Sequence, residues 1–463
     1  MKWFLNVKVW CAVVGVCLMS IIPTKTLAVP RSMGSDDDNG IVRVIRVGYG
    51  GDYVQLDSAL AAAPAGSIIE ILPGLHLGQW IIDRPLTLRG RHGAVLDGGG
   101  VGTTITVTAP NVTIQALNVQ HTGTSPVDAA ILVQARAVTI EGNRFERFMR
   151  GIVIGDGVEG SGDAAFTIVR NNTLIGSPEG NLLEQSVGIT LLKASTTLVE
   201  LNTIVAVQTG IAVADSPQSV IRGNAIRFTE TAIVSPLPVH PSSIFDVTET
   251  VLHPAASNIL IEQNTLEHNA TAVKLVGGER MTIRSNLLRN QQVQALLIHN
   301  STDLVVTGNR FQQNTRAITI GGHGTVDIQR NRFLNNEVVL NLGAGDCVIT
   351  MRQNDLLHNR YPLLHESQAP DVVWEGNYWE YHSLHDWWFR QQARWSDRNR
   401  DGLAELPYLI GDVVDPSPAL EPYLTAGLTI DQSLLSLRNA ILIGISLIGL
   451  SWLLYCLKRM VFR

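Results

Sequence analysis

One asparagine recurs along the chain at a nearly fixed spacing, and this recurrence constrains the fold more than any other feature. Each copy ends a short run of alternating apolar and polar residues, as in Val138–Asn143 and Met281–Asn286. The five steps from Asn264 to Asn377 each span 22 or 23 residues. Self-similarity at such a period indicates a solenoid, in which every turn stacks on the next. The recurring residues are Asn143, Asn172, Asn202, Asn224, Asn264, Asn286, Asn309, Asn331, Asn354 and Asn377.

The residues around each asparagine predict strands. The run before it alternates with the period of a strand, and eight residues after it a small residue opens a second β-rich run, as in Gly151–Ile152 and Gly210–Ile211. Each period therefore holds two or three strands and no helix, which argues against a leucine-rich horseshoe. We expect an all-β, right-handed parallel β-helix with rungs of 22 or 23 residues, stacked about 4.8 Å apart.

The asparagines are expected to be structural. At a turn, asparagine can adopt a left-handed backbone and hydrogen-bond to its copy on the next rung. At the front, residues 53–63 can form a short helix that covers the first rung, followed by strands at 67–72 and 86–88. The Trp-rich segment after Asn377 can cover the other end, so that neither open sheet edge invites aggregation.

The two ends of the chain predict export and a membrane anchor. Lys2 and Lys8, an apolar run and a small-residue site at Ala28 are typical of a secretory signal, because an uncleaved anchor needs roughly 20 apolar residues. An uncharged run followed by Lys458 and Arg459 predicts a helix that crosses the inner membrane, with the solenoid on the periplasmic side. A buried amphipathic helix is the alternative for this run, and its apolarity on all faces argues against it.

The expected organisation has seven parts. They are a signal peptide at 1–28, a flexible linker at 29–40, the β-helix at 41–379, a Trp- and His-rich cap with an acidic turn at 380–425, a juxtamembrane linker at 426–439, a transmembrane helix at 440–457 and a cytoplasmic tail at 458–463.

Charge and cysteine content exclude several classes of function. The net charge is −6 and no basic stripe is visible, so we expect no nucleic-acid partner. Of the four cysteines, Cys347 alone would remain in the exported region, which excludes a disulfide framework and a zinc finger.

Three insertions interrupt the repeat and are candidate binding loops. The interval from the small residue to the next asparagine is 14 residues in regular rungs, but 21 from Gly151 to Asn172 and 32 from Ala232 to Asn264. A further insertion precedes Gly188, and insertions in solenoids often shape the binding face. Plain surface loops are the alternative. The candidate residues in the loops are Asp156, Glu159, Asp163, Glu179, Glu184, His240 and His253.

The C-terminal cap offers two candidate metal sites. His382 and His385 would share one helix face and, with Asp386, could bind copper or zinc, although a purely structural aromatic cap explains the same residues. Further on, Asp397, Asn399 and Asp401 space oxygen ligands as in the first half of a calcium loop. The glutamate of the twelfth position is replaced by tyrosine, and a charged turn is the alternative. Copper or calcium is therefore the expected metal, if the chain binds one.

Several passages resemble the NosD-like proteins. They are Leu72–Gly74, Ile82–Gly90, Val95–Gly99, Gly376–Trp379 and Asp397–Tyr408. The resemblance implies a periplasmic accessory protein that works with an ABC-type transporter while the copper centres of nitrous oxide reductase are assembled. It implies no known set of catalytic residues.

Two departures from that family are visible. Its middle rungs often carry an Arg-Tyr-Gly run followed by His-Tyr-Met, whereas residues 269–274 here read Asn-Ala-Thr-Ala-Val-Lys. A copper role therefore lacks its most attractive ligands in these rungs. The C-terminal anchor is not expected of every member, so a relative with a different client enzyme is an alternative.

Two classes of function follow. The first is a non-catalytic, membrane-anchored periplasmic factor that docks a transporter or a client enzyme. The second is a protein that binds or modifies an acidic polysaccharide, as a lyase or epimerase would. Such an enzyme needs a base, an acid and a charge-neutralising group in one cleft, whereas the acidic residues here are scattered across rungs. We therefore favour the first class and expect no catalytic residue.

Overall fold

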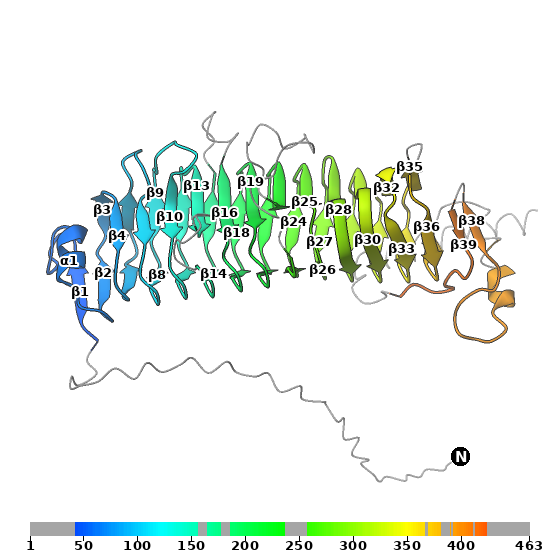
Figure 1. The fold of residues 1–463 in the computed structure, drawn as a ribbon, viewed down its shortest axis with the longest axis horizontal. Coiled ribbons are helices and arrows are strands. Elements are labelled where there is room, and N and C mark those ends of the chain that lie inside the picture. The colour runs from blue at the N-terminus through cyan, green and yellow to red at the C-terminus, as the bar shows by residue number, and fades with distance from the viewer. Residues whose placement is uncertain are drawn as a thin grey trace, which may run out of the picture. The chain divides into compact units, whose positions relative to one another are not determined.

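The chain winds into a β-solenoid. The computed structural model describes residues 42–155, 164–176, 186–236, 257–365, 369–380, 389, 392–410 and 413–423. Strands of successive turns lie side by side in two long parallel sheets, and one short antiparallel pair follows them (Figure 1). The all-β parallel solenoid predicted from the repeat is confirmed. The predicted membrane helix at 440–457 lies outside the described ranges, and no helix within them is both long and apolar enough to cross a bilayer.

The larger sheet takes two strands from most turns. Its strands are β1 (Val44–Val47), β2 (Ile68–Ile71), β4 (Trp80–Ile82), β5 (Thr87–Gly90), β7 (Ile105–Val107), β8 (Thr113–Gln115), β10 (Ala129–Val133), β11 (Thr139–Glu141), β13 (Arg150–Ile154), β14 (Ile168–Arg170), β16 (Val187–Leu192), β17 (Leu198–Glu200), β19 (Thr209–Ala214), β20 (Val220–Arg222), β22 (Thr231–Ser235), β23 (Leu260–Glu262), β25 (Thr271–Val276), β26 (Thr282–Arg284), β28 (Gln294–Thr307), β30 (Arg316–Gln329), β32 (Val338–Gly345), β33 (Val348–Arg352), β35 (Tyr361–His365) and β36 (Val372–Glu375).

The smaller sheet takes one strand from each turn. Its strands are β3 (Gly74–Leu77), β6 (Ala94–Asp97), β9 (Asn118–Gln120), β12 (Arg144–Glu146), β15 (Thr173–Ile175), β18 (Thr203–Val205), β21 (Ala225–Arg227), β24 (Thr265–Glu267), β27 (Leu287–Arg289), β29 (Arg310–Gln312), β31 (Arg332–Leu334), β34 (Asp355–Leu357) and β37 (Tyr378–Glu380). The antiparallel pair is β38 (Tyr408–Ile410) with β39 (Val413–Asp415).

The core is built from columns of equivalent apolar residues. Ile140 on β11 is in register with Val169 on β14, and that residue with Val199 on β17. All three are fully buried. Burying one such side chain contributes about 1.5–3 kcal/mol, and the column repeats this gain at every turn. The small residues predicted before the second strand have a steric role, because a Cβ on Gly188 would lie 2.6 Å from the carbonyl oxygen of Gly210.

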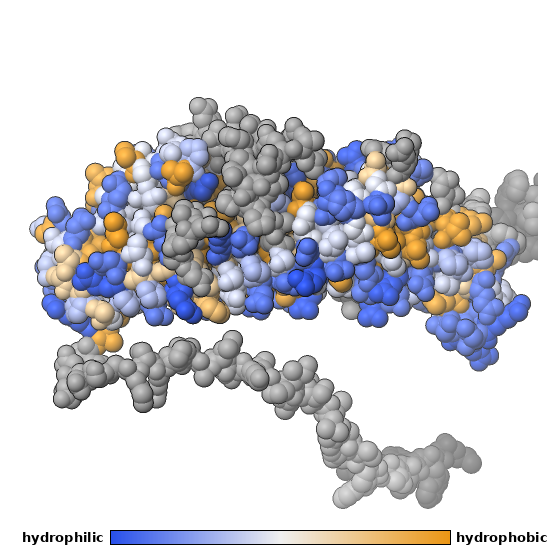
Figure 2. Space-filling view, in the orientation of Figure 1, coloured by the Kyte–Doolittle hydropathy of each residue, from blue (hydrophilic) through white to orange (hydrophobic). Residues whose placement is uncertain are grey.

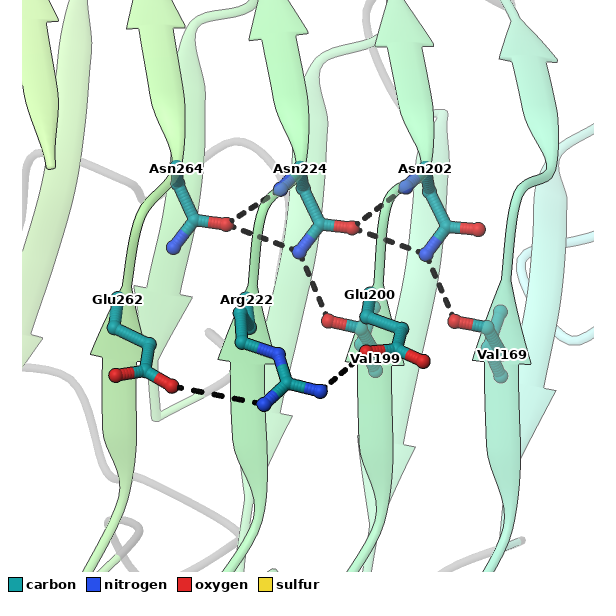
Figure 3. A network of polar contacts seen from close by, with 8 residues as sticks. All are labelled: Val169, Val199, Glu200, Asn202, Arg222, Asn224, Glu262 and Asn264. Carbon is teal, nitrogen blue, oxygen red and sulfur yellow. Dashed lines mark hydrogen bonds and ion pairs between the residues drawn. The ribbon is translucent and has the colours of Figure 1, made fainter. Parts of the chain in front are cut away.

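The recurring asparagines form a continuous buried ladder. The backbone N–H and Nδ2 of Asn202 both donate to Oδ1 of Asn224, at 3.0 Å each, and Asn224 donates to Asn264 in the same way (Figure 3). Nδ2 of Asn224 also donates to the carbonyl oxygen of Val199 at 2.9 Å. The predicted structural role is therefore confirmed.

The left-handed backbone at this turn belongs to a different residue from the one predicted. It lies at the position before the ladder asparagine, for example Leu201 with a φ of 55° and Gln263 with a φ of 55°. The asparagine itself keeps a negative φ because its backbone N–H must point along the solenoid axis to the next Oδ1. The expectation that the asparagine adopts the left-handed conformation was wrong. The predicted hydrogen bond from each asparagine to its copy on the next rung is confirmed.

A second ladder runs through the later turns, five residues after the first. The backbone N–H of Asn269 donates to Oε1 of Gln291, and the N–H of Gln291 donates to Oδ1 of Asn314. Asn336 and Asn359 continue the series. These turns are thus fixed at two corners by buried amide side chains, each of which satisfies backbone donors that the corner would otherwise leave unpaired.

A row of alternating charges follows one register position of the larger sheet. Arg222 lies between Glu200 at 2.5 Å and Glu262 at 3.9 Å, so one guanidinium bridges two rungs (Figure 3). Opposite charges on neighbouring strands attract each other, and this attraction favours the observed strand register over a register shifted by one residue. From β1 to β26 the row reads Arg46, Glu70, Arg89, Gln115, Glu141, Arg170, Glu200, Arg222, Glu262 and Arg284.

Glu70 is the most enclosed acid of this row. It is 6% exposed and contacts Arg46, Arg89 and Arg91 at 3.6, 2.9 and 3.0 Å. Burial alone would raise the pKa of Glu70, but the hydrogen bond from Arg89 and the charges of the three arginines outweigh it and lower the pKa below the ordinary value of 4.5. Folding therefore favours the ionised carboxylate.

This lowered pKa predicts a pH-dependent contribution to stability. The stabilisation is complete above the unfolded-state pKa near 4.5 and is lost as the pH falls through the lower folded-state value. We expect Glu70→Gln to lower the midpoint of thermal unfolding at pH 7, and the difference from the native protein to shrink as the pH falls through this window. Glu375→Gln, an exposed position in the same row, is the control and should follow the native curve. A pH-independent gap for Glu70→Gln would contradict the electrostatic explanation.

Both ends of the solenoid are covered. The helix α1 (Leu56–Ala62) buries Leu56 and Ala59 against the first turns, as predicted for residues 53–63. At the other end Trp379 stacks on Tyr408 with ring centres 5.2 Å apart, and Phe389 contacts Tyr408 at 4.8 Å. These rings cover the last turn of the core.

The last asparagine of the ladder is capped by a carboxylate. Asp415 is fully buried, and its Oδ2 accepts bonds from the backbone N–H and Nδ2 of Asn377, at 2.8 and 3.1 Å, and from Nε1 of Trp379 at 3.0 Å. Its Oδ1 accepts from the backbone N–H groups of Gly376 and Ser417. Asp415 thus stands where a further rung would place its asparagine.

Candidate functional site

The outward face of six neighbouring strands carries the most distinctive polar side chains. The strands are β10, β13, β16, β19, β22 and β25, and the sequence insertions at 156–163, 177–185 and 237–256 begin or end beside three of them. We call this surface the insertion face. Ala129, Val153, Leu192 and Ala214 form an apolar cluster on it that is separate from the core.

Arg150 begins β13 and lies in the outward row of this face. Its register partners are Ala129 on β10 and Val187 on β16, and the row continues through Thr209, Thr231 and Thr271. Burial lowers the pKa of Arg150 below the usual arginine value, and no acidic group opposes that effect. Within the parts of the chain that the structure describes, its guanidinium makes no ion pair and no hydrogen bond.

Two further polar groups belong to the same surface. Thr190 on β16 is 1% exposed, and its hydroxyl has no hydrogen-bond partner in the described structure. Its neighbours in sequence, Ile189 and Leu191, belong to the core, so strand alternation places Thr190 on the outward side. On β25, burial lowers the pKa of Lys274, an effect that the charge of Glu230 opposes. The insertion face therefore carries partly buried cations and hydroxyl groups.

All seven residues predicted for the binding loops lie outside the described residues and remain predictions, as do the three predicted ligands of the histidine-rich cap. These residues are Asp156, Glu159, Asp163, Glu179, Glu184, His240, His253, His382, His385 and Asp386.

The predicted acidic turn is described, and its side chains serve the turn itself. Asp397 accepts from the backbone N–H of Gly402 at 3.3 Å, and Asp401 accepts from that of Leu403 at 2.9 Å. Nδ2 of Asn399 donates to Asp401 at 2.9 Å, so a donor rather than a free oxygen faces that carboxylate. The turn projects beyond the end of the solenoid and is hydrophilic in the view of Figure 2. Calcium binding at these residues stays a prediction.

The described residues do not fit a copper centre. No group of three or more His, Cys, Asp or Glu side chains converges among them. Cys347 is buried, and its Sγ lies 3.3 Å from the carbonyl oxygen of Gly322, as expected for a core thiol. Burial raises the pKa of this thiol, with a further contribution from Asp346, so the thiolate that would bind a soft metal is disfavoured.

Sequence reasoning missed Arg150 and Thr190, although the repeat contained a signal for the arginine. The residue before the small residue is Val187, Thr209, Thr231 or Thr271 in the neighbouring rungs, and a long cation at this position is the exception. Thr190 gave no such signal, because a threonine is ordinary on a strand and its missing partner appears only in three dimensions.

Two family models match the chain. Residues 98–235 match the right-handed β-helix region, and residues 239–383 match the family described as periplasmic copper-binding protein NosD. With the parallel sheets and the stacked rungs, the first match defines the chain as a right-handed parallel β-helix protein.

More specifically, the chain is a NosD-like right-handed β-helix protein. It is 40% identical over 78 residues to a probable ABC transporter binding protein NosD of Pseudomonas aeruginosa, and the match covers 16% of this chain and 18% of that relative. The chain therefore matches about a fifth of the length of this curated relative. The resemblance to the NosD-like proteins, which the front and back motifs indicated, is confirmed as a likeness of sequence and fold.

Solved structures share the fold at low sequence identity. The family 28 exopolygalacturonase of Yersinia enterocolitica superposes with a TM-score of 0.50 at 13% identity, covering 72% of this chain and 78% of the enzyme. The periplasmic alginate epimerase AlgG gives a TM-score of 0.47 at 13% identity, over 70% of this chain and 82% of the epimerase. At this identity the likeness to the exopolygalacturonase shows the fold alone.

Proposed function

We propose that this chain is a membrane-anchored periplasmic accessory protein that assists copper-centre maturation of nitrous oxide reductase together with an ABC-type transporter. The observation that carries the proposal is the match of residues 239–383 to the NosD family, which the family description places in the periplasm. The name of the Pseudomonas aeruginosa relative, an ABC transporter binding protein, supports a transporter as partner.

The proposed role is docking rather than copper storage in the solenoid. The described residues offer no group of three or more converging His, Cys, Asp or Glu side chains. A long solenoid held by two amide ladders is instead a stiff scaffold, which can present one surface to a transporter and another to a client enzyme. The proposed anchor at 440–457 would hold that scaffold at the membrane in which a transporter resides.

Deletion of the gene in the native host tests this proposal. We expect the copper content and the activity of nitrous oxide reductase to fall while the amount of reductase protein stays unchanged. Complementation with the full chain should restore both. A chain ending at residue 439 should restore less, because it lacks the proposed anchor. Normal reductase in the deletion strain, accompanied by altered extracellular polysaccharide, would refute the accessory role and support the polysaccharide alternative.

A further inference from the structure

Aliphatic side chains gather on the surface at the C-terminal end of the solenoid. Val348 on β33, Val373 on β36, Leu409 on β38 and Val414 on β39 are 52–61% exposed. We call these four residues the C-terminal patch. The strand β36 pairs with β33 and packs beside β39, so the patch continues from the larger sheet onto the cap. Figure 2 shows hydrophobic surface over these last strands.

The strand register turns these side chains away from the core. Leu409 and Val414 are directly opposite each other in the antiparallel pair, so both lie on one face of it. The other face carries Tyr408 and Val413, which are buried in the core. On β36, both sequence neighbours of Val373 are in register with core residues of β33, so Val373 itself points outward. Packing of the solenoid therefore does not require aliphatic residues at these positions, and such a patch marks a contact with a partner or a membrane.

The described chain ends beside exposed residues of the same cap. Trp395 is 86% exposed, and its neighbour Arg394 contacts Glu421 at 3.0 Å. Tyr423 is the last described residue, and its hydroxyl donates to the carbonyl oxygen of Gly376 at 2.8 Å. Tryptophan and tyrosine are enriched where a protein meets the interface of a bilayer.

The proposed anchor follows this end of the solenoid closely in the sequence. Residues 424–439 separate Tyr423 from the apolar run at 440–457. Even fully extended, a segment of this length spans at most about 60 Å. The anchor would therefore hold the cap, and with it the C-terminal patch, close to the bilayer.

We propose that the C-terminal patch rests on the periplasmic surface of the inner membrane, with its aliphatic side chains at the boundary between lipid headgroups and acyl chains. Apolar groups of surface-bound proteins lie about 5–10 Å deep in this layer. The inference rests on the proposed anchor and names the lipid bilayer as a further partner of the cap.

The chemistry of the patch favours lipid over a protein partner. Hot spots between proteins are rich in Trp, Tyr and Arg and poor in Val and Leu, whereas the patch consists only of valines and one leucine. Charge contributes little, because Asp397, Asp401 and Glu405 of the acidic turn offset the arginines of the cap. The contact should therefore not depend on anionic lipid.

Quenching by labelled lipid tests this contact. Full-length protein is reconstituted into phosphatidylcholine vesicles, with and without phosphatidylglycerol, and the vesicles are floated to isolate the anchored chain. A fluorophore is attached at Val373→Cys or Val414→Cys, in a chain whose cysteines other than the buried Cys347 are replaced by serine. The quencher is a lipid with a nitroxide near its headgroup, and Leu75→Cys, an exposed aliphatic position in the first turns, is the control. We expect at least twofold stronger quenching at the two patch positions than at the control, with either lipid composition.

Charged substitutions test the contribution of the patch itself. We expect Leu409→Asp combined with Val414→Asp to reduce the quenching at Val373→Cys to that of the Leu75→Cys control, because carboxylates are excluded from the apolar layer. Leu75→Asp combined with Leu77→Asp adds the same charge at exposed positions of the first turns and should leave the quenching unchanged. Both double variants should keep the native midpoint of thermal unfolding in detergent, since all four side chains are exposed.

Three results would overturn the inference. The first is a chain that floats with the vesicles while the probes at Val373→Cys and Val414→Cys are quenched no more than the control. The second is unchanged quenching after Leu409→Asp and Val414→Asp. The third is a chain that does not float, which would refute the proposed anchor as well. The first two leave the anchor and the maturation of the reductase untouched, so failure of the inference and failure of the proposed function are distinguishable.

Discussion

Replacing Asn224 with alanine is expected to lower the free energy of unfolding by about 4 kcal/mol, because several buried groups lose their partners at once. The backbone N–H and Nδ2 of Asn202 both donate to Oδ1 of Asn224. The carbonyl oxygen of Val199 accepts from its Nδ2. A buried donor or acceptor left unsatisfied costs about 1–3 kcal/mol, and water cannot replace these bonds inside the solenoid.

Denaturant unfolding followed by circular dichroism measures this loss. The matched control is Asn341→Ala, because Asn341 lies on β32 between two core residues, Leu340 and Leu342, and therefore on the outward side. Its side chain makes no hydrogen bond within the described residues, so a change below about 0.5 kcal/mol is expected, as for an ordinary surface substitution. Equal losses for the two variants would show that the ladder contributes nothing specific.

The sequence was sufficient for the first ladder and for the solenoid. The asparagine recurs without interruption from Asn143 to Asn377, and a residue that must bond to its own copy on the next rung cannot vary. The second ladder was missed because it includes Gln291 and begins only at Asn269, so its residue type and its extent are both irregular. Its signal, an amide side chain five residues after each ladder asparagine from Asn264 to Asn354, becomes clear once these rungs are aligned.

The candidate site could be predicted only in part. The three insertions could be located from the sequence, since insertion lengths can be read from the repeat, and the face beside them stays a candidate binding face. The charged residues inside those insertions were then the obvious candidates, whereas the group that the described structure singles out is Arg150 on a strand. Its importance depends on the absence of an acid nearby, and such an absence cannot be read from sequence separation.

The position of Asp415 in the C-terminal cap could not be predicted from the sequence repeat either. Asp415 lies 38 residues beyond Asn377 and belongs to an antiparallel pair rather than to a rung. Nothing in the repeat requires an aspartate there, because the chain between them has left the solenoid. Only the unpaired amide at the end of the ladder shows that an acceptor is needed.

Asp415→Ala is expected to lower the free energy of unfolding by about 3–5 kcal/mol, through the loss of a buried acceptor shared by five donors. Three of them, the backbone N–H and Nδ2 of Asn377 and Nε1 of Trp379, share Oδ2. The loss should also release the segment from 403 to 423, because Asp415 joins it to the last rung. Hydrogen exchange of the backbone amides in that segment, measured beside denaturant unfolding, detects both effects.

Asp415→Asn and an exposed aspartate test the proposed reason for that loss. An asparagine can keep the three bonds of Oδ2, as the ladder asparagines do for one another, but its amide nitrogen would face the N–H groups of Gly376 and Ser417. Its loss of stability should therefore lie between those of the native protein and Asp415→Ala. Asp346→Ala removes an exposed carboxylate of the same size and should change the stability little. If Asp415→Asn destabilised the protein as much as Asp415→Ala, the carboxylate would be acting through its charge rather than as the missing rung of the ladder.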